Sequence, residues 1–324
     1  MGNRNTVWVT NRWFIIITLK KSIMKTINLR NAISASVGIL ALAAAGLFTS
    51  CCKDDPADPN AKALVKIHVS DFTISQDAFY GAKSAEDLAD YTNVGAIDLA
   101  FYEGTTEVYK TTQLRSDNTT YTTFGEFECN LPIGNYTMVV IGRGYSNGDV
   151  FVLTSPTSAG YTSERARETF CATQDVTVTS TTPLDLNVIL SRVIAKLHIV
   201  STDNRSASVT KIRTTYSAGG KSFNPTTGLA TVNTGFSVTN TPSTAVQTLD
   251  VGNYTFLATD EQTMTITIEA LDASDNVLFT KVVPNVPLKR NRITTLTGQV
   301  FTAGTSSGSF QVETDWLEGN TVEF

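Results

Sequence analysis

The stretch Lys66–Asp71 reads K-I-H-V-S-D, and a similar stretch, K-L-H-I-V-S-T-D, returns at Lys196–Asp203. A second pair follows in the same order, with L-P-I-G-N-Y-T-M at Leu131–Met138 and L-D-V-G-N-Y-T-F at Leu249–Phe256. Motifs that return in the same order at similar spacing indicate two domains of one design. In the second motif we expect the glycine to permit a turn and the following aromatic residue to face a core.

Between these motifs, apolar and polar residues alternate as in strands. Val94–Glu103 and Thr263–Leu271 each place three large apolar residues on one face, and residues 274–276 form a turn into a strand at Val277–Val283. The inward residues expected on the two stretches are Ile97, Leu99 and Phe101, then Met264, Ile266 and Ile268. Alternation of this kind is typical of antiparallel sheets with one wet face.

The pattern predicts an all-β protein with one β-sandwich at 62–190 and a second at 191–324. The boundary falls near Ser191, where a strand at Leu184–Leu190 leads almost directly into the next one. Only Ser84–Tyr91 has a helical pattern, and the stretch 143–170 reads as the longest irregular part. Each half is about 130 residues long, which is enough to bury its own core.

The N-terminal region predicts export and lipid attachment. Residues 31–52 carry no charge and follow Lys25 and Arg30, and their apolar run, Val37–Phe48, ends at small residues before Cys51. A basic flank, a short apolar run and small residues are the parts of a secretory signal. The run resembles a bacterial lipobox, in which Cys51 would be acylated, with Cys52 as the fallback. A transmembrane helix is the alternative, since 22 uncharged residues could span a bilayer.

Residues 1–50 are thus predicted to comprise an upstream segment and the signal peptide, with translation starting at Met24. Residues 51–61 follow as an acidic tether. Within it, Lys53-Asp54-Asp55 resembles the surface-export signal of Bacteroidetes lipoproteins, and a solvated charged tether is the alternative interpretation.

The charge of the mature chain restricts its partners. Removal of residues 1–50 takes away six of the 25 basic residues and none of the 30 acidic ones, which leaves a net charge of −11. This balance argues against nucleic acid and against electrostatic adhesion to an anionic membrane. We therefore expect the lipid to supply the attachment to the outer membrane.

Three further motifs resemble the Bacteroidales fimbrillin superfamily, which contains fimbrial stalk, tip and anchor subunits. They are the junction Leu186–Lys196 (L-N-V-I-L-S-R-V-I-A-K), a late strand Val286–Gly298 (V-P-L-K-R-N-R-I-T-T-L-T-G) and the tail Phe310–Trp316 (F-Q-V-E-T-D-W). The resemblance implies two tandem transthyretin-like Greek-key sandwiches. It also implies a cell-surface fimbrial protein whose partners are other subunits, joined by strand addition.

The same resemblance implies that a C-terminal strand can serve as the donor. The donor residues would be Phe310, Val312, Thr314 and Trp316, and an ordinary closing strand of the second domain is the alternative. Stalk subunits are trimmed after a basic residue, but the first arginine after Cys51 is Arg115. Because lysines come earlier, trimming stays an alternative. The sequence favours an anchor or accessory subunit over a proteolytically matured stalk or tip subunit.

Residues suited to catalysis or metal binding do not group in the sequence. The two histidines, His68 and His198, occupy matching positions of the repeat, which favours a structural role. No Cys-x-x-Cys spacing is present, and G-x-S-x-G occurs only at Gly144–Gly148 and Gly304–Gly308, with no helical pattern after either. We therefore expect no enzyme activity, no cofactor and no metal.

The sequence leaves two interpretations open, one for a pair of cysteines and one for a group of three aromatic residues. Outside the cytoplasm Cys129 and Cys171 could form a disulfide, with two separate buried thiols as the alternative. Tyr145, Phe151 and Tyr161 could form the aromatic surface of a carbohydrate- or protein-binding module, although the more ordinary interpretation is that they cover the sandwich.

Overall fold

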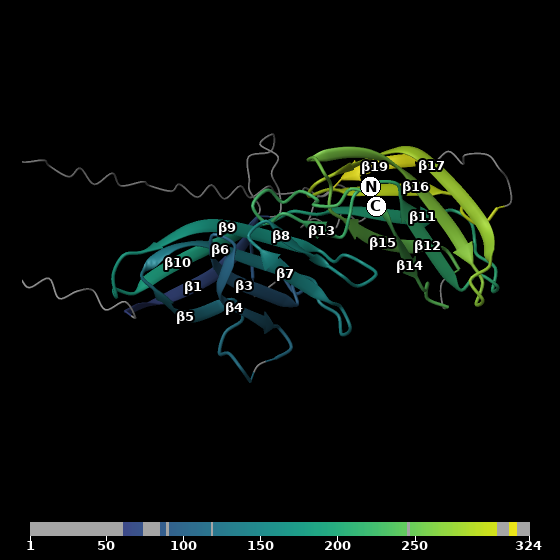
Figure 1. Ribbon diagram of the computed structural model, residues 1–324. Helices are drawn as coiled ribbons and strands as arrows, with labels where there is room; N and C mark the ends of the chain where they lie inside the picture. Colours follow the sequence, from purple (N-terminus) through teal and green to yellow (C-terminus); the bar gives the residue numbers. More distant parts are fainter. Residues whose placement is uncertain are drawn as a thin grey trace, which may run out of the picture. The chain divides into compact units, whose positions relative to one another are not determined.

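The computed structural model describes residues 61–73, 85–88, 91–117, 119–244, 247–302 and 311–315, all within the compact unit Asp54–Phe324. Every helix or strand in these ranges is a β-strand, numbered β1 to β19 (Figure 1). The all-β class predicted from the sequence is confirmed. The described part of the chain contains no helix long and apolar enough to cross a bilayer.

The first eight-stranded sheet has the order β2-β1-β10-β9-β6-β3-β4, and β5 pairs with β1. Its strands are β1 (Lys62–Thr73), β2 (Ala85–Asp87), β3 (Ala96–Glu103), β4 (Thr106–Leu114), β5 (Glu126–Pro132), β6 (Gly134–Arg143), β9 (Thr169–Val178) and β10 (Leu184–Arg192). The segment with the helical pattern contains β2, which pairs with the end of β1, so the helix prediction was wrong. Pairing with a neighbouring strand outweighs local propensity there.

This sheet folds over on itself. Strands β9 and β10 share only two residue pairs, Cys171 with Ser191 and Phe170 with Arg192. On either side of this short join, β5-β1-β10 and β9-β6-β3-β4 contribute buried side chains to one core. That core includes Ile67, Leu99 and Leu131, none of which is exposed to solvent. We call these eight strands the first sandwich.

The second sandwich has two four-stranded sheets, β15-β11-β18-β19 and β14-β12-β16-β17. Its strands are β11 (Ala195–Ser201), β12 (Lys211–Tyr216), β14 (Phe236–Asn240), β15 (Asp250–Thr255), β16 (Glu261–Leu271), β17 (Val277–Lys289), β18 (Ile293–Gly298) and β19 (Gln311–Asp315). Inward residues of both sheets, such as Ile199, Ile268 and Leu296, are fully buried in one core. All six residues predicted to face inward are buried, and β16 alternates as predicted. Strand β3 is buried on both faces, so the wet face expected there was wrong.

The repeat seen in the sequence is visible in the strand pairing. In the first sandwich β1 lies between antiparallel β5 and parallel β10. In the second, β11 lies between antiparallel β15 and parallel β18. The two K-x-H stretches therefore occupy equivalent strands, each between an antiparallel and a parallel neighbour.

The G-N-Y-T motifs are not equivalent in the structure. Gly134 begins β6, and Tyr136 behind it is buried, whereas Gly252 lies within β15 opposite His198. In β15 it is Asn253 that is buried, because a shift of one residue exchanges the two faces of a strand. Neither glycine has a positive φ. Gly134 directly follows the bend between β5 and β6, as expected, whereas Gly252 lies inside β15, so the turn role expected there was wrong. A Cβ at Gly252 would lie 2.8 Å from Lys196 Cε, at the far end of a flexible side chain.

A small third sheet connects the two sandwiches. It consists of β7 (Phe151–Ser155), β8 (Ser158–Tyr161) and β13 (Ser222–Phe223), in the order β13-β8-β7. The hairpin β7–β8 lies inside the stretch expected to be irregular, so that expectation was wrong. Gly160 pairs with Ser222, and a Cβ there would lie 2.6 Å from Ser222 Cα, so only glycine allows this approach.

Candidate functional site

The predicted lipidation site, Cys51, lies outside the described residues. The first described strand, β1, begins at Lys62, directly after the predicted tether. Four alternate residues of β1 point into the first core: Ala63, Val65 and Ile67 are fully buried, and Val69 is 4% exposed. The strand nearest the predicted anchor is thus a central element of the first sandwich.

The predicted donor residues fall on and beside β19. Its backbone pairs antiparallel with β18, with Val312 opposite Leu296 and Thr314 opposite Thr294, while Phe310 and Trp316 lie outside the described residues. Strand β19 has β18 as its one neighbour in the described sheet, so it forms an edge. The closing-strand arrangement is therefore the one seen here, and donation to a neighbour stays a prediction.

The two histidines hold matching positions on the strand surfaces. His68 on β1 contacts the carboxylate of Glu126 on β5, and His198 on β11 lies 2.7 Å from Asp250 on β15. Each pair joins an opening strand to its antiparallel neighbour and is partly exposed to solvent. Among the described residues, no group of three or more His, Cys, Asp or Glu side chains is placed to hold a metal ion.

The disulfide between Cys129 and Cys171 is not formed. Both are free, buried thiols, and they belong to two different apolar clusters. Cys129 lies on β5 and Cys171 on β9, with β1 and β10 between them. The two strands are not neighbours in the sheet, and their thiols point into different clusters, so the Cβ atoms do not meet as a disulfide requires. The alternative of two separate buried thiols is the correct one.

We expect the free energy of unfolding to fall above pH 9 because of these thiols. Burial raises the pKa of Cys129 from 9.0 to about 11, and it also raises the pKa of Cys171. The unfolded chain therefore loses these protons first. Stability is complete below pH 9 and declines as pH rises, by at most about 1.4 kcal/mol per pH unit for each thiol. Urea unfolding of the wild type and Cys129→Val tests this. Equal pH slopes for the two proteins would contradict it.

The aromatic group is mostly packed inside the protein. Tyr161 is 4% exposed and contacts Phe151 with ring centroids 5.0 Å apart. The guanidinium of Arg143, which forms a buried ion pair of 2.6 Å with Asp98, lies 4.7 Å from the Phe151 ring centroid. Tyr145 is the most exposed of the three, at 37%. The interpretation as cover for the sandwich accounts for these contacts better than a binding surface does.

The junction between the sandwiches contains a buried charged cluster that sequence reasoning missed. Arg192 at the end of β10 has a fully buried side chain, and its Nη2 lies 2.7 Å from the Glu168 carboxylate. Arg192 also donates hydrogen bonds to the Tyr91 hydroxyl at 2.8 Å and to Asn291 Oδ1 at 3.0 Å. Burial and the neighbouring Glu168 raise the pKa of Tyr91 well above its usual range, so the phenol stays protonated.

Two motifs singled out in the sequence meet in this cluster. Arg192 belongs to the junction motif, and Asn291 belongs to the motif expected to form one late strand. That expectation was wrong, because β17 ends at Lys289, a turn with Asn291 at φ 58° follows, and β18 begins at Ile293. The main-chain N–H of Asn291 donates to the Ile194 carbonyl at 2.9 Å. The two motifs therefore fold against each other.

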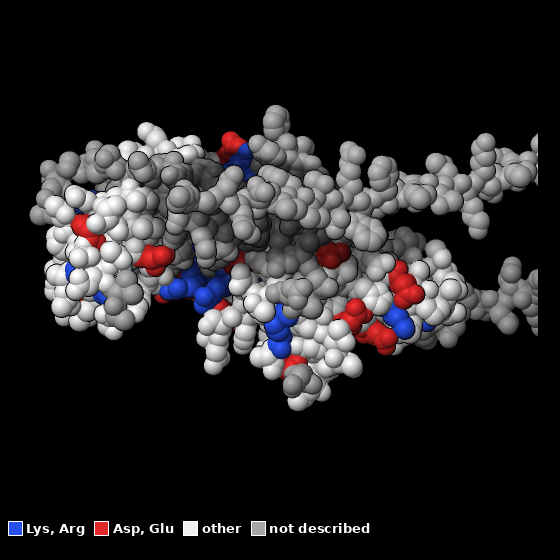
Figure 2. Space-filling view, turned by 180° about the vertical axis from the view of Figure 1, so that it is seen from behind, with Lys and Arg blue, Asp and Glu red and all other residues white. Residues whose placement is uncertain are grey.

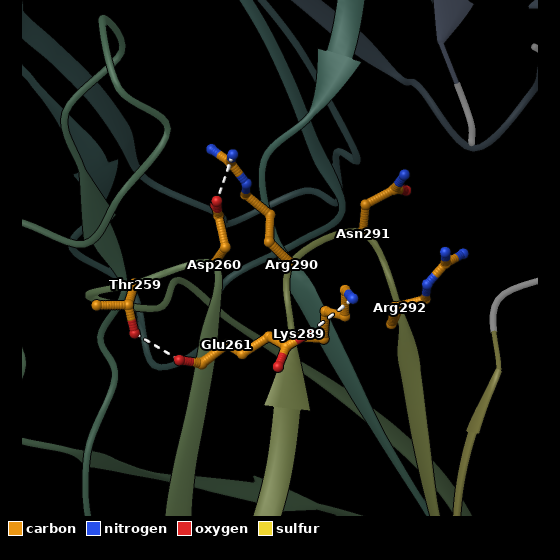
Figure 3. Close-up of a pocket in the computed structure, with 7 residues that line it drawn as sticks. All are labelled: Thr259, Asp260, Glu261, Lys289, Arg290, Asn291 and Arg292. Carbon is orange, nitrogen blue, oxygen red and sulfur yellow. Dashed lines mark hydrogen bonds and ion pairs between the residues drawn. The ribbon is translucent and has the colours of Figure 1, made fainter. Parts of the chain in front are cut away.

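A charged hollow of about 570 Å³ lies beside this turn (Figure 3). Its walls are residues 259–261 at the start of β16 and residues 289–292. Figure 3 shows Asp260 facing Arg290, an ion pair of 2.6 Å, and Lys289 forms a second 2.6 Å pair with Glu261. The acidic and basic groups of the hollow thus largely neutralise one another.

Residues 145–320, more than half of the 324-residue chain, match DUF6562, a family of unknown function. The chain belongs to this family. The DUF6562 match begins just before β7 and includes the small connecting sheet and the second sandwich. No curated protein matches the chain.

Solved structures similar to this DUF6562 chain come from Bacteroidales. An adhesin candidate from Bacteroides ovatus has a TM-score of 0.48 and 12% identity, covering 74% of this chain and 88% of its own. The fimbrial anchor protein Mfa2 from Porphyromonas gingivalis has a TM-score of 0.45 and 12% identity, covering 73% and 90%.

Proposed function

We propose that this chain is a lipid-anchored, cell-surface subunit of a fimbria or a related adhesive assembly, in the position of an anchor or accessory subunit. The proposal comprises a lipoprotein signal ending before Cys51, a tether at 51–61, and two transthyretin-like sandwiches at 62–190 and 191–324. The resemblance of the sequence motifs to fimbrillins supports this proposal, and its main structural support is one observation.

That observation is the place of β1. It directly follows the tether, and it lies in the middle of its sheet, between β5 and β10. Its removal would open a groove lined by the partners of Ala63, Val65, Ile67 and Val69. A strand from a neighbouring subunit could fill such a groove, with main-chain hydrogen bonds providing affinity and alternate side chains setting the register.

The anchor position is favoured because β1 is poorly placed for removal. The first arginine after Cys51 is Arg115, and its guanidinium donates to the carbonyls of Val94, Leu88 and Tyr91 at 2.7 to 3.1 Å. Lys66 lies within β1 and pairs with Glu128 of β5 at 3.4 Å. A protease would have to break these contacts to cut at either residue. A chain that is not cut keeps both β1 and its link to the lipid.

The partner contact would then use the other end of the chain. Strand β19 lies at the edge of its sheet with one described neighbour, which suits a strand that either closes its own sandwich or pairs with another subunit. The packed aromatic residues 145, 151 and 161 give no comparable support to a carbohydrate-binding role.

The intact mass and N-terminal residue of the protein from its native cell surface test this proposal. We expect an acylated Cys51 on a chain that retains β1, and we expect Cys51→Ser to release the protein from the membrane fraction. Cys52→Ser is the matched control and should remain attached. A chain beginning after Lys62, Lys66, Lys83 or Arg115 would instead make this a stalk or tip subunit matured by proteolysis.

A further inference from the structure

The sheet edges of this protein are not equally protected against strand addition. Strand β17 is the edge next to β16, and it carries devices that natural proteins use to block edge pairing. Lys281 points inward, is 6% exposed, and donates to the Thr302 carbonyl at 3.0 Å. Pro284 and Pro287 lie on the same strand, and its pairing with β16 contains two register shifts. This edge is built to stay unpaired.

Strand β4 carries fewer of these devices: its pairing with β3 has one register shift, and Lys110 is its one lysine. Its nine residues contain no proline, and it pairs with β3 along its length while its other edge has no strand partner among the described residues. Strand β5 likewise pairs with β1 on one side and has no second strand partner in the described sheet. Both strands therefore present unused main-chain donors and acceptors.

The two free edges face one gap in the first sandwich. At one end the Gln113 side chain of β4 joins them, donating to the Glu126 carbonyl at 2.7 Å and accepting from the Gly125 amide at 2.8 Å. Beyond this link lies a hollow of about 460 Å³, lined from both strands. We name it the β4–β5 slot; the strand residues that line it include Tyr109, Thr111, Gln113, Glu126, Phe127 and Glu128, and residues of the loop between the strands complete it. Figure 1 shows β4 and β5 together at this border of the first sandwich.

Acidic side chains predominate around the slot. Glu126 and Glu128 on β5 have side chains that are 45% and 64% exposed, and Asp117 lines the hollow from the loop between the strands. Hydrogen bonds from the Thr119 amide and hydroxyl lower the pKa of Asp117, so it stays ionised. Lys66 on β1 offsets part of this charge by pairing with Glu128, and His68 contacts Glu126. Figure 2 shows acidic side chains dispersed over one face of the molecule, with basic groups among them.

We propose that the β4–β5 slot binds an extended segment of a partner protein that carries lysine or arginine at alternate positions. Such a segment would pair its main chain with the free edges of β4 and β5 and place its basic side chains against Glu126, Glu128 and Asp117. The slot differs from the groove beneath β1, and it does not depend on the lipid anchor. The chain's own tail is a poor occupant, since Glu313 and Asp315 would be repelled.

Two labelled peptides test the charge requirement. One has the native sequence of residues 310–316, and the other has the same sequence with E313K and D315K. With the full-length chain at low ionic strength, we expect the lysine peptide to bind at least tenfold more tightly, and the difference to shrink in high salt. Hydrogen exchange should show new protection at residues 106–114 and 126–132. Equal binding of both peptides, or protection at another edge, would overturn the proposal.

Charge reversal on β5 locates the site. Combining Glu126→Lys with Glu128→Lys should weaken binding of the lysine peptide at least tenfold. Asp250→Lys is the matched control, because Asp250 is the carboxylate paired with His198 in the second sandwich, and it should leave binding unchanged. All three positions are exposed, so thermal unfolding should show folded variants. Self-association that protects β4 without any peptide would assign the slot to a second copy and overturn the proposal.

Discussion

Replacing Arg192 with methionine is expected to destabilise the protein by about 3–5 kcal/mol. The reason is the uncompensated charge that the variant leaves behind. Glu168 is 5% exposed, and Arg192 is its ion-pair partner at 2.7 Å. The Tyr91 hydroxyl would still donate to the Glu168 carboxylate at 2.6 Å, but a neutral phenol cannot replace a cation. Equilibrium unfolding in urea measures the loss.

A double variant separates the charge effect from lost packing. Arg192→Met combined with Glu168→Gln removes both charges, so we expect it to be clearly more stable than Arg192→Met alone. If the single variant unfolds within about 1 kcal/mol of the wild type, the cluster is hydrated and the interpretation of a buried ion pair fails.

The second large effect is expected from Phe223→Ala, at about 3–5 kcal/mol. Phe223 on β13 is fully buried, and its ring stacks on Phe256 with centroids 4.4 Å apart. Both rings belong to an apolar cluster that also contains Leu153 and Ala159 of the β7–β8 hairpin. Truncation would therefore leave a cavity between the hairpin and the second sandwich.

Hydrogen exchange shows whether the damage reaches the hairpin. We expect Phe223→Ala to lower protection of the β7–β8 amides as well as those near β13. Phe236→Ala is the control, because Phe236 stacks on Tyr216 at 4.9 Å within the second sandwich, and it should leave the hairpin unchanged. Unaltered protection of residues 151–161 in Phe223→Ala would show that the small sheet does not couple the sandwiches.

Both predictions concern the contacts that connect the two sandwiches, and these contacts matter for the proposed function. A subunit in a surface fibre transmits force along its chain. Two residues link β10 to β11 along the chain. The sandwiches are also joined by three sets of contacts: the Arg192 cluster, the pairing of β8 with β13 and the shared apolar cluster. We therefore expect the sandwiches to unfold together.

The inward faces of long strands such as β3 and β16 could be predicted from the sequence alone. Side-chain alternation has a period of two, so a face that must be apolar is written directly into the chain, as in Ile97, Leu99 and Phe101. The repeated K-x-H stretches likewise indicated equivalent strands. His68 and His198 lie at matching positions on those strands, and their structural role stays a prediction. Local signals failed where pairing partners decided the outcome, as at β2.

What only the tertiary structure decided is how distant segments meet. The sequence kept a disulfide open for Cys129 and Cys171, but strand order places β1 and β10 between them. Nothing near Arg192 in the chain identifies Glu168, Tyr91 and Asn291 as its partners. The slot between β4 and β5 likewise lies between two strand edges, and the sequence pattern does not predict that these edges face each other. Periodicity reports which way a side chain faces, whereas contacts depend on sheet order and register, and these are set by the packing of the whole chain.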